Sequence, residues 1–295
     1  MKLSIIIPVK NRAHIIEQTI NSILSTNYPD LEIIVIDNNS KDEIEKIIKS
    51  YKNIIFVKNN QDKERSFSRN LGIKLSTGKF ITFLDSDDLL KKEIFHSFIQ
   101  AFKIYNNDKF FFTNFDYIEN NLIKTNYNPF KKEFCKIDDL VKSNLISNIG
   151  IFIDRELALD NIWDENKNII GTEDYDFVLR LMIKVKRAVL IKKSTLALVR
   201  LHDGRSVFND KKFKILKRYF YFKKKIFNNN EFKNLKLTFK KKILSTQSLY
   251  ASLLLINCGE RKKSFKFLLQ SIRYNLFSIY SKRFIYILIK LIFKK

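Results

Sequence analysis

Three carboxylates stand close together directly behind a short apolar run. The run is Phe80 to Leu84, and Asp85, Asp87 and Asp88 follow it with only Ser86 between them. Like charges at this spacing repel one another unless a positive group lies among them. Mg²⁺ and Mn²⁺ prefer oxygen ligands, and proteins commonly bind them with one or two carboxylates together with the phosphates of a substrate. The pattern therefore predicts a divalent-cation site that takes a nucleoside di- or triphosphate.

Two other apolar runs also end in polar clusters. Leu3–Val9 is followed by Lys10 and Asn11, and Leu31–Ile36 is followed by residues 37–40, DNNS. Asp and Asn are ordinary turn residues, so a single loop of this kind would carry little weight. In parallel sheets covered by helices, however, ligands bind at the carboxyl ends of the strands. Three polar clusters at one edge of a sheet favour a binding site over three unrelated turns.

The elements that must position these clusters alternate along the first two hundred residues. Strands are expected at 3–9, 31–36, 54–57 and 80–84. A first helix is expected to begin at a cap on Asn11 and to run to Leu24, and a second to follow residues 37–40 and run to Ile48. A third is expected at 66–75, with Gly78 as its terminating residue. This alternation is typical of an α/β fold with a mostly parallel sheet covered on both faces. The chain contains neither GxxxxGK[ST] nor GxGxxG, which excludes a P-loop and a typical dinucleotide fold.

Four segments, in this order, resemble the family 2 glycosyltransferases: LSIIIPVKN (3–11), EIIVIDNNS (32–40), SRNLGIKLSTGKFITFLDSDD (68–88) and GTEDYDFVLRL (171–181). The resemblance covers residues 1–205. It implies the GT-A fold, a Rossmann-like mostly parallel sheet flanked by helices. It also implies a nucleotide-sugar donor and transfer with inversion at the anomeric carbon. The QxxRW motif of processive members is missing from the sequence, so the expected reaction is the transfer of a single sugar.

The resemblance implies roles for individual residues on the donor side. Pro8, Lys10 and Asn11 would line the nucleotide pocket. Asp37 would hydrogen-bond the base, and Arg69 would contact the nucleotide or its phosphates. We expect the nucleotide to be UDP.

The resemblance also assigns the carboxylates of the opening motif. Asp85 and Asp87 would form the family's DxD motif. Asp87 would bind Mn²⁺ or Mg²⁺ directly, and Asp85 would contact the ribose or a metal-bound water. His202 would contact the diphosphate or the metal, although a lone histidine is more often structural, and Arg200 and Arg205 would add positive charge nearby. A cation at this place stabilises the charge that grows on the departing diphosphate.

Glu173 and Asp174 are candidates for the base that an inverting transfer needs to deprotonate the acceptor hydroxyl. The apolar spacing of Phe177 to Met182 places them at the N-terminus of a helix, whose dipole favours ionised carboxylates. From the residues alone they could equally be first-turn acids that cap the helix. The resemblance makes Asp174 the base and Glu173 its neighbour on the acceptor side. Asp176 is given no role beyond the helix itself.

The net charge of +24 is concentrated in the last third of the chain. Residues 206–295 contain 23 Lys and Arg but only 3 Asp and Glu, which leaves 32 basic and 28 acidic residues for the part before them. An AT-rich genome would spread extra Lys along the whole chain, so the asymmetry indicates a functional boundary. We expect a catalytic domain at 1–205 and a basic, helical, membrane-associating region at 206–295.

The basic region is expected to be helical at 213–227, 235–256, 264–276 and 278–293. The segments 217–227 and 282–295 interleave aromatic and aliphatic residues with Lys, which suits the surface of an anionic membrane. The last apolar run, Phe284 to Phe293, is about half the length needed to span a bilayer. A solvated helical bundle is an alternative. Nucleic-acid binding is not expected, because no motif for it is present and the catalytic half is not basic.

Two further features bear on location. Cys135 and Cys258 lie far apart and in no metal or redox spacing, as expected in a reducing compartment. The N-terminal apolar run is too short for a signal peptide. We therefore expect a cytoplasmic protein at the inner face of the cell membrane that glycosylates a lipid-linked or surface glycan of the lipopolysaccharide type. The alternatives are transfer to a protein or a soluble saccharide, and a non-catalytic module that binds sugar nucleotides or membranes.

Overall fold

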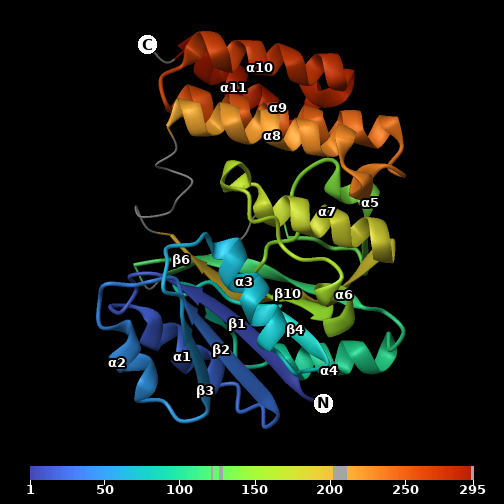
Figure 1. Cartoon of the computed structure of the whole chain (residues 1–295). Helices are drawn as coiled ribbons and strands as arrows, with labels where there is room; N and C mark the ends of the chain where they lie inside the picture. Colours follow the sequence, from blue (N-terminus) through green and yellow to red (C-terminus); the bar gives the residue numbers. More distant parts are fainter. Residues whose placement is uncertain (121, 126–128, 202–210, 294–295) are drawn as a thin grey trace. The chain divides into compact units, whose positions relative to one another are not determined.

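The computed structural model describes residues 1–120, 122–125, 129–201 and 211–293 (Figure 1). The chain forms two compact units. The first comprises Met1–Lys136, Leu145–Glu165 and the segment from Glu173 to the end of strand β10. The second comprises Ile137–Asn144, Asn166–Thr172 and the helices that follow residue 210. The boundary expected at residues 205 and 206 lies outside the described residues and stays a prediction.

The first unit is built on one mixed sheet. Four parallel strands at one side are ordered β3-β2-β1-β4: β1 (Leu3–Val9), β2 (Leu31–Asp37), β3 (Ile54–Lys58) and β4 (Phe80–Phe83). The order continues from β4 through four more strands: β9 (Ile151–Asp154), β6 (Phe110–Glu119), β10 (Arg187–Arg200) and β5 (Leu89–Leu90). Two short strands pair beside this path: β7 (Leu122–Lys124) with β6, and β8 (Phe134–Lys136) with β10.

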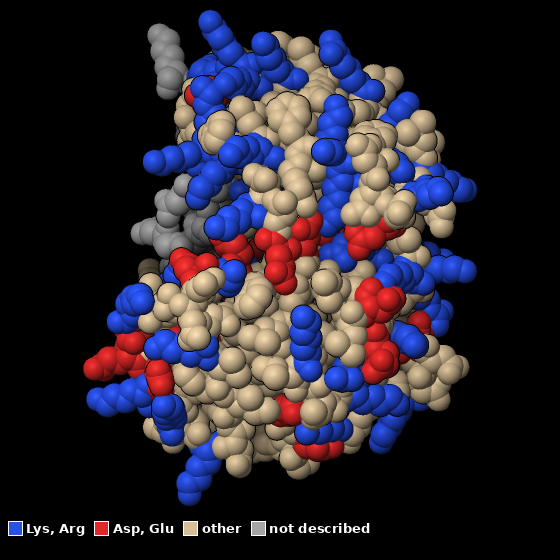
Figure 2. Space-filling view, in the orientation of Figure 1, with Lys and Arg blue, Asp and Glu red and all other residues tan. Residues whose placement is uncertain are grey.

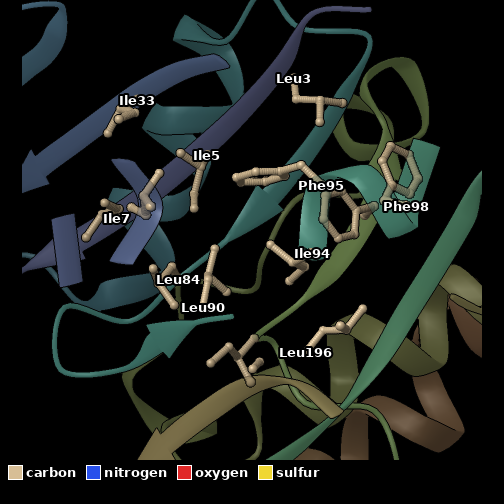
Figure 3. Close-up of a cluster of buried hydrophobic side chains, with 14 of the residues drawn as sticks. Leu3, Ile5, Ile7, Ile33, Leu84, Leu90, Ile94, Phe95, Phe98 and Leu196 are labelled. Atoms are coloured by element: carbon tan, nitrogen blue, oxygen red, sulfur yellow. The ribbon is translucent and has the colours of Figure 1, made fainter. Parts of the chain in front are cut away.

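Helices cover both faces of this sheet, which confirms the expected α/β architecture. They are α1 (Ile16–Leu24), α2 (Ile44–Lys49), α3 (Arg65–Leu75), α4 (Ile94–Ile104), α6 (Arg155–Leu159) and α7 (Glu173–Val185). Side chains of β1 alternate between the two faces, as strand geometry requires. Ile5 and Ile7 share a cluster with Phe95 and Phe98 of α4 (Figure 3). Ile6 points to the other face, where Gly72 of α3 approaches it so closely that a Cβ would clash.

Two predicted details of the helices were wrong. Asn11 does not cap α1, because the helix begins at Ile16 and the backbone of Asn11 is left-handed, at φ +50°. Its N–H instead donates to Ser40 Oγ at 2.8 Å, and its Oδ1 accepts from the Lys41 N–H at 2.8 Å. Gly78 does not end α3, which stops at Leu75. A Cβ at Gly78 would lie 2.6 Å from the backbone nitrogen of Ser4, so glycine is needed for close approach to β1.

The second unit is a helical bundle, and the four expected helices are confirmed in it. Its helices and helical turns are α5 (Ile137–Leu140), η1 (Lys167–Ile169), α8 (Lys212–Asn228), η2 (Asn230–Phe232), α9 (Leu237–Asn257), α10 (Arg261–Tyr274), η3 (Leu276–Tyr280) and α11 (Lys282–Phe293). Tyr219 of α8 packs against Leu255 of α9 and Phe267 of α10. Among the described helices, none combines the length and the hydropathy that crossing a bilayer would require.

Candidate active site

Asp85, at the end of β4, is held by two partners from other parts of the first unit. Its Oδ1 accepts from Arg69 Nη2 at 2.7 Å and from Asn148 Nδ2 at 3.1 Å. Burial alone would raise the pKa of Asp85, but the charges of Arg69 and Arg65 and the two hydrogen bonds outweigh it and lower the pKa below its ordinary value. The carboxylate is therefore ionised at neutral pH. The positive group expected among the three carboxylates is, for Asp85, the buried side chain of Arg69.

The other two carboxylates of the motif turn to different partners. Asp87 Oδ2 lies 3.5 Å from Arg12 Nη2, and Asp88 Oδ1 accepts from the backbone N–H of Arg200 at 2.9 Å. Arg200 also donates through Nε to the backbone oxygen of Asp87 at 3.0 Å, and so fixes the loop rather than presenting a bare charge. No cluster of three or more His, Cys, Asp or Glu side chains placed to hold a metal ion occurs among the described residues. The three acids thus share a loop without forming a carboxylate cage.

Arg69 is locked in place by an aromatic stack. Only 1% of it is exposed, and its guanidinium carbon lies 4.4 Å from the ring centre of Trp163. The Trp163 ring stacks on Phe177 of α7 at 4.0 Å with an interplanar angle of 6°. A desolvated cation over a tryptophan is worth about 2 kcal/mol or more. Within the described part of the chain, Nε and Nη1 of Arg69 have no hydrogen-bond partner.

Asn70, the next residue along α3, fixes the backbone on which Trp163 sits. Its Oδ1 accepts from the Trp163 N–H at 2.7 Å, and its Nδ2 donates to the Trp163 carbonyl at 2.9 Å. The same Nδ2 donates to Glu165 Oε1 at 2.7 Å. The Arg-Asn pair of the SRN segment therefore couples the strand-end carboxylate Asp85 to the loop that precedes α7.

The N-terminus of α7 carries the two acids that the sequence singled out, and the helix begins at Glu173 as predicted. Glu173 is buried, and its Oε1 lies 3.1 Å from Arg65 Nε. Asp174 is half-buried, and its Oδ1 accepts from the Tyr175 N–H at 2.8 Å. Burial, followed by the charge of Glu173, raises the pKa of Asp174 to about 6. A carboxylate with such a pKa is suited to accept a proton near neutral pH.

Arg65 brings the two halves of the site together. The charge of Glu173 raises the pKa of Arg65 against the opposing effect of burial, and Asp85 and Asp174 add to the increase. The strand-end carboxylate and the helix-start carboxylates therefore all act electrostatically on one cation, and Glu173 pairs with it directly. Arg65 lies four residues before Arg69 on α3, so the two guanidinium groups share a face of that helix.

Asp176 has a role that the sequence analysis did not give it. It is fully buried, and its Oδ2 accepts from Arg180 Nε at 2.9 Å across one turn of α7. A buried ion pair fixes both side chains, because removal of one partner leaves an uncompensated charge. The burial and the ion pair of Asp176 were not predicted, since period alone does not tell which face of α7 is covered.

The predicted nucleotide residues lie at the ends of β1 and β2. Asp37 is fully buried; its Oδ1 accepts from the Ser40 N–H at 3.0 Å, while its Oδ2 has no partner within the described ranges. Pro8 is buried within β1, and Lys10, which follows the strand, pairs with Asp62. Asn11 ties the two loops together through Ser40, as described above. His202 and Arg205 lie outside the described residues, so their predicted roles have no structural description.

The profile of the family described as Glycosyl transferase family 2 matches residues 4–155, just over half of the chain. The chain belongs to this family. Three of the motif segments lie inside the matched range apart from Leu3, whereas the segment with Glu173 and Asp174 lies beyond it. The family match therefore includes the donor-side residues up to Asp88 but not Asp174, the candidate base.

Several relatives with curated names are similar to parts of the chain. An uncharacterized glycosyltransferase MJ1057 of Methanocaldococcus jannaschii is 31% identical over 176 residues, 56% of this chain and 59% of that protein. The GalNAc(5)-diNAcBac-PP-undecaprenol beta-1,3-glucosyltransferase of Campylobacter jejuni is 36% identical over 94 residues, 30% of each. The UDP-Glc:alpha-D-GlcNAc-diphosphoundecaprenol beta-1,3-glucosyltransferase WfaP of Escherichia coli is 42% identical over 88 residues, 29% of this chain and 35% of that one. The matches thus span at most about three fifths of these relatives.

Solved structures of TarS from S. aureus share the fold. TarS 1–349 in complex with UDP-GlcNAc superposes with a TM-score of 0.59 and 16% identity over 93% of this chain and 89% of that chain. At that identity the likeness concerns the fold alone, and it confirms that this family 2 chain has the GT-A architecture.

Five residues of the site were missed in the sequence: Arg12, Arg65, Asn70, Asn148 and Trp163. Arg65 had a readable signal, because it precedes Arg69 by one helical turn. Trp163 is the single tryptophan of the chain, but only the fold brings it onto Arg69. Asn148 lies in a loop without a distinguishing pattern.

Proposed function

We propose that the chain is an inverting glycosyltransferase that moves one sugar from a UDP-linked donor to a hydroxyl of a lipid-linked or surface glycan, with Mn²⁺ or Mg²⁺ as cofactor. One observation carries the proposal. Arg69 pairs with Asp85 at 2.7 Å, and Arg65 pairs with Glu173, the neighbour of Asp174, at 3.1 Å. The charges of both arginines favour the ionised forms of Asp85 and Asp174. A carboxylate kept ionised and a carboxylate with a pKa of about 6 are thus placed at one site, which suits cation binding by one and proton transfer by the other.

The donor side of the site supports a nucleoside diphosphate. The unpartnered Asp37 Oδ2 is a buried acceptor suited to an N–H of a base, since a buried polar atom without a partner is costly. Arg12 follows β1 and supplies positive charge 3.5 Å from Asp87, while Lys10 at the same strand end pairs with Asp62. TarS was crystallised with UDP-GlcNAc and WfaP is named for a UDP-Glc donor, which supports UDP here.

The residues present fit a divalent cation. Asp85 and Asp87 keep 30% and 20% of their side chains exposed, and one or two carboxylates suffice for Mg²⁺ when substrate phosphates complete the ligand set. Asp87 would bind the ion directly, Asp85 would contact the ribose or a metal-bound water, and His202 is a further proposed ligand. When bound, the cation would neutralise charge on the departing diphosphate.

The chain's own residues then act at the acceptor. Asp174 accepts the proton of the acceptor hydroxyl while that oxygen forms its bond to the anomeric carbon. The bond from that carbon to the diphosphate oxygen breaks on the opposite face, and the electron pair leaves with the diphosphate. Glu173, held by Arg65, keeps a negative charge next to Asp174 and so raises its affinity for the proton.

The acceptor and the location follow from the relatives and the charge. Two relatives are named for acceptors linked to undecaprenol through a diphosphate, which supports a lipid-linked glycan. Such an acceptor lies at a membrane, and the basic helices after residue 206 would hold the enzyme peripherally on its anionic inner face. The catalytic domain would then end near residue 205. Transfer to a protein or a soluble saccharide is the alternative with the same chemistry.

A screen of nucleotide sugars tests the proposal. Purified protein is incubated with UDP-, GDP- and dTDP-linked sugars, with Mn²⁺, Mg²⁺ or a chelator, and release of the free nucleotide is followed. We expect hydrolysis of a UDP sugar that the chelator abolishes. Binding without any hydrolysis, by a correctly folded protein, would instead favour the non-catalytic module.

A further inference from the structure

Helix α11 has two apolar faces. On one side Phe284 and Ile287 are buried against Leu249 of α9 and Leu268 of α10. On the other side a second apolar set remains 48–78% exposed: Ile285, Tyr286, Ile289, Ile292 and Phe293. A bundle helix normally buries its single apolar stripe and turns polar residues outward. The second set therefore needs an explanation beyond the packing of the bundle.

The exposed residues of α11 form one stripe. Ile285, Ile289 and Ile292 follow one another at i, i+4 and i+7, and Tyr286 and Phe293 run beside them one heptad apart. The turn η3, which precedes α11 and packs against it, adds exposed apolar residues of its own, among them Phe277 at 73%. We call the five exposed residues of α11 the α11 face.

Positive charge outweighs acid around the α11 face, where the nearest acid in the sequence, Glu260, pairs with Lys212 at 2.7 Å. Residues 261–293 contain eight Lys and Arg and no Asp or Glu, and none of the helices α8 to α11 contains an acid. Lys290 Nζ lies 4.8 Å above the Tyr286 ring and donates to Asn257 Oδ1 at 2.9 Å, at the edge of the stripe. Lys and Arg side chains are spread over this helical unit (Figure 2). The charge is diffuse, as for an extended anionic surface, rather than gathered at one point.

We infer that α11 lies in the interface of an anionic membrane with the α11 face inserted between the lipid headgroups. The inference rests on the proposed membrane association and assigns it to one face. An apolar stripe with Ile, Phe and Tyr, flanked by Lys and Arg, is the pattern of a helix that lies in the interfacial plane. Basic side chains then remain at the level of the headgroups, where each raises the binding constant for the membrane about fivefold. A second copy of the chain suits this face poorly, because the same cations would meet one another.

Helix α8 is the less suitable candidate, although segment 217–227 was also expected to insert. Tyr219, Phe222 and Ile226 are buried within the bundle. Phe213 and Phe220 stay exposed beside a cavity of about 390 Å³. These two phenylalanines offer a matched control, since they are exposed apolar residues of the same basic unit.

The test compares two double variants of the full chain in vesicle co-sedimentation. Ile285→Gln/Ile289→Gln alters the α11 face, and Phe213→Gln/Phe220→Gln alters α8; glutamine keeps both charge and helix propensity. The vesicles are phosphatidylcholine with phosphatidylglycerol, or phosphatidylcholine alone, at low and high salt. We expect the α11 variant to bind anionic vesicles about tenfold or more weakly than wild type, because two half-exposed isoleucines lose their transfer energy. The α8 variant should stay within about twofold of wild type.

The outcomes distinguish a failure of the α11 assignment from a failure of the proposed membrane association. If the wild type binds neither kind of vesicle, the membrane association itself fails and the inference falls with it. If the wild type binds and the α11 variant binds equally well, or the α8 variant alone is weakened, only the assignment to α11 is overturned. Sedimentation velocity adds a further arm: a wild-type dimer that the α11 variant turns into a monomer would make the face a self-interface and refute the inference. Circular dichroism and nucleotide-sugar hydrolysis, unchanged in both variants, confirm that each is folded.

Discussion

Replacing Asp174 by asparagine should stabilise the protein at neutral pH while it removes the base. The pKa of Asp174 is raised from 3.8 to about 6, because burial and the charge of Glu173 disfavour the ionised form. A folded-state pKa above the unfolded one means that the folded protein holds this proton more tightly. The contribution of Asp174 to the free energy of unfolding is therefore largest below about pH 4 and is lost as the pH rises through about 6. Asparagine keeps the shape and the acceptor for the Tyr175 N–H, and it has no charge to desolvate.

The size of the effect follows from the shift. A rise of about 2 pKa units corresponds to about 3 kcal/mol at 1.36 kcal/mol per unit. Asp174 is half-buried rather than fully enclosed, so solvent screening reduces this to about 1–2 kcal/mol. Asp174→Asn should thus gain nothing in the acidic range and about 1–2 kcal/mol above pH 7, with the rise between pH 4 and 6.

Urea unfolding of wild type and Asp174→Asn at a series of pH values measures the difference, in which the titration of groups that do not interact with Asp174 cancels. Asp176→Asn is the matched control in the same helix turn. It breaks the buried pair with Arg180 and should destabilise the protein by about 3–5 kcal/mol at pH 7. An Asp174→Asn difference that is negative, or flat across pH 4 to 7, would refute the reasoning that a desolvated carboxylate stands at this position.

The other predictions concern the donor side. Asp87→Ala should abolish metal-stimulated turnover with little change in Tm, since the ion pair of its side chain with Arg12 is partly exposed and contributes little; near-normal turnover with Mn²⁺ would contradict the DxD assignment. Trp163 is the single tryptophan and stacks on Arg69, so its fluorescence should change when UDP binds, and constant emission at saturating UDP would count against the site. Trp163→Leu should cost about 3 kcal/mol or more of stability in urea and weaken UDP binding in calorimetry, whereas Trp163→Phe should restore most of the binding.

The sequence predicted those features that depend on local period and on strand ends. Leu3–Val9 was read correctly because a buried parallel strand is a continuous apolar run. The start of α7 at Glu173 was read correctly because the apolar spacing after it is helical and acids favour a helix N-terminus. These signals are local, so the fold class and the edge of the sheet that bears the site could both be derived.

The features that escaped prediction depend on contacts between distant segments. The spacing of Asp85, Asp87 and Asp88 does not predict their partners. Arg69 donates to Asp85, and the backbone N–H of Arg200 donates to Asp88. The buried pair of Asp176 and Arg180 was missed because burial on α7 depends on what covers it. From the sequence, α11 reads as one amphipathic helix. Only the structure shows that the bundle buries one set of its apolar residues and leaves a second set exposed.

One measurement tests the central claim that Asp174 is the base at a nucleotide-sugar site. Turnover and UDP-sugar binding are measured side by side for wild type and Asp174→Asn, with the donor found in the screen. We predict that turnover falls by about a hundredfold or more, the usual range for loss of a general base, while the dissociation constant of the donor stays within about twofold. A variant that loses binding and turnover in equal measure, or that keeps its turnover, would contradict the assignment.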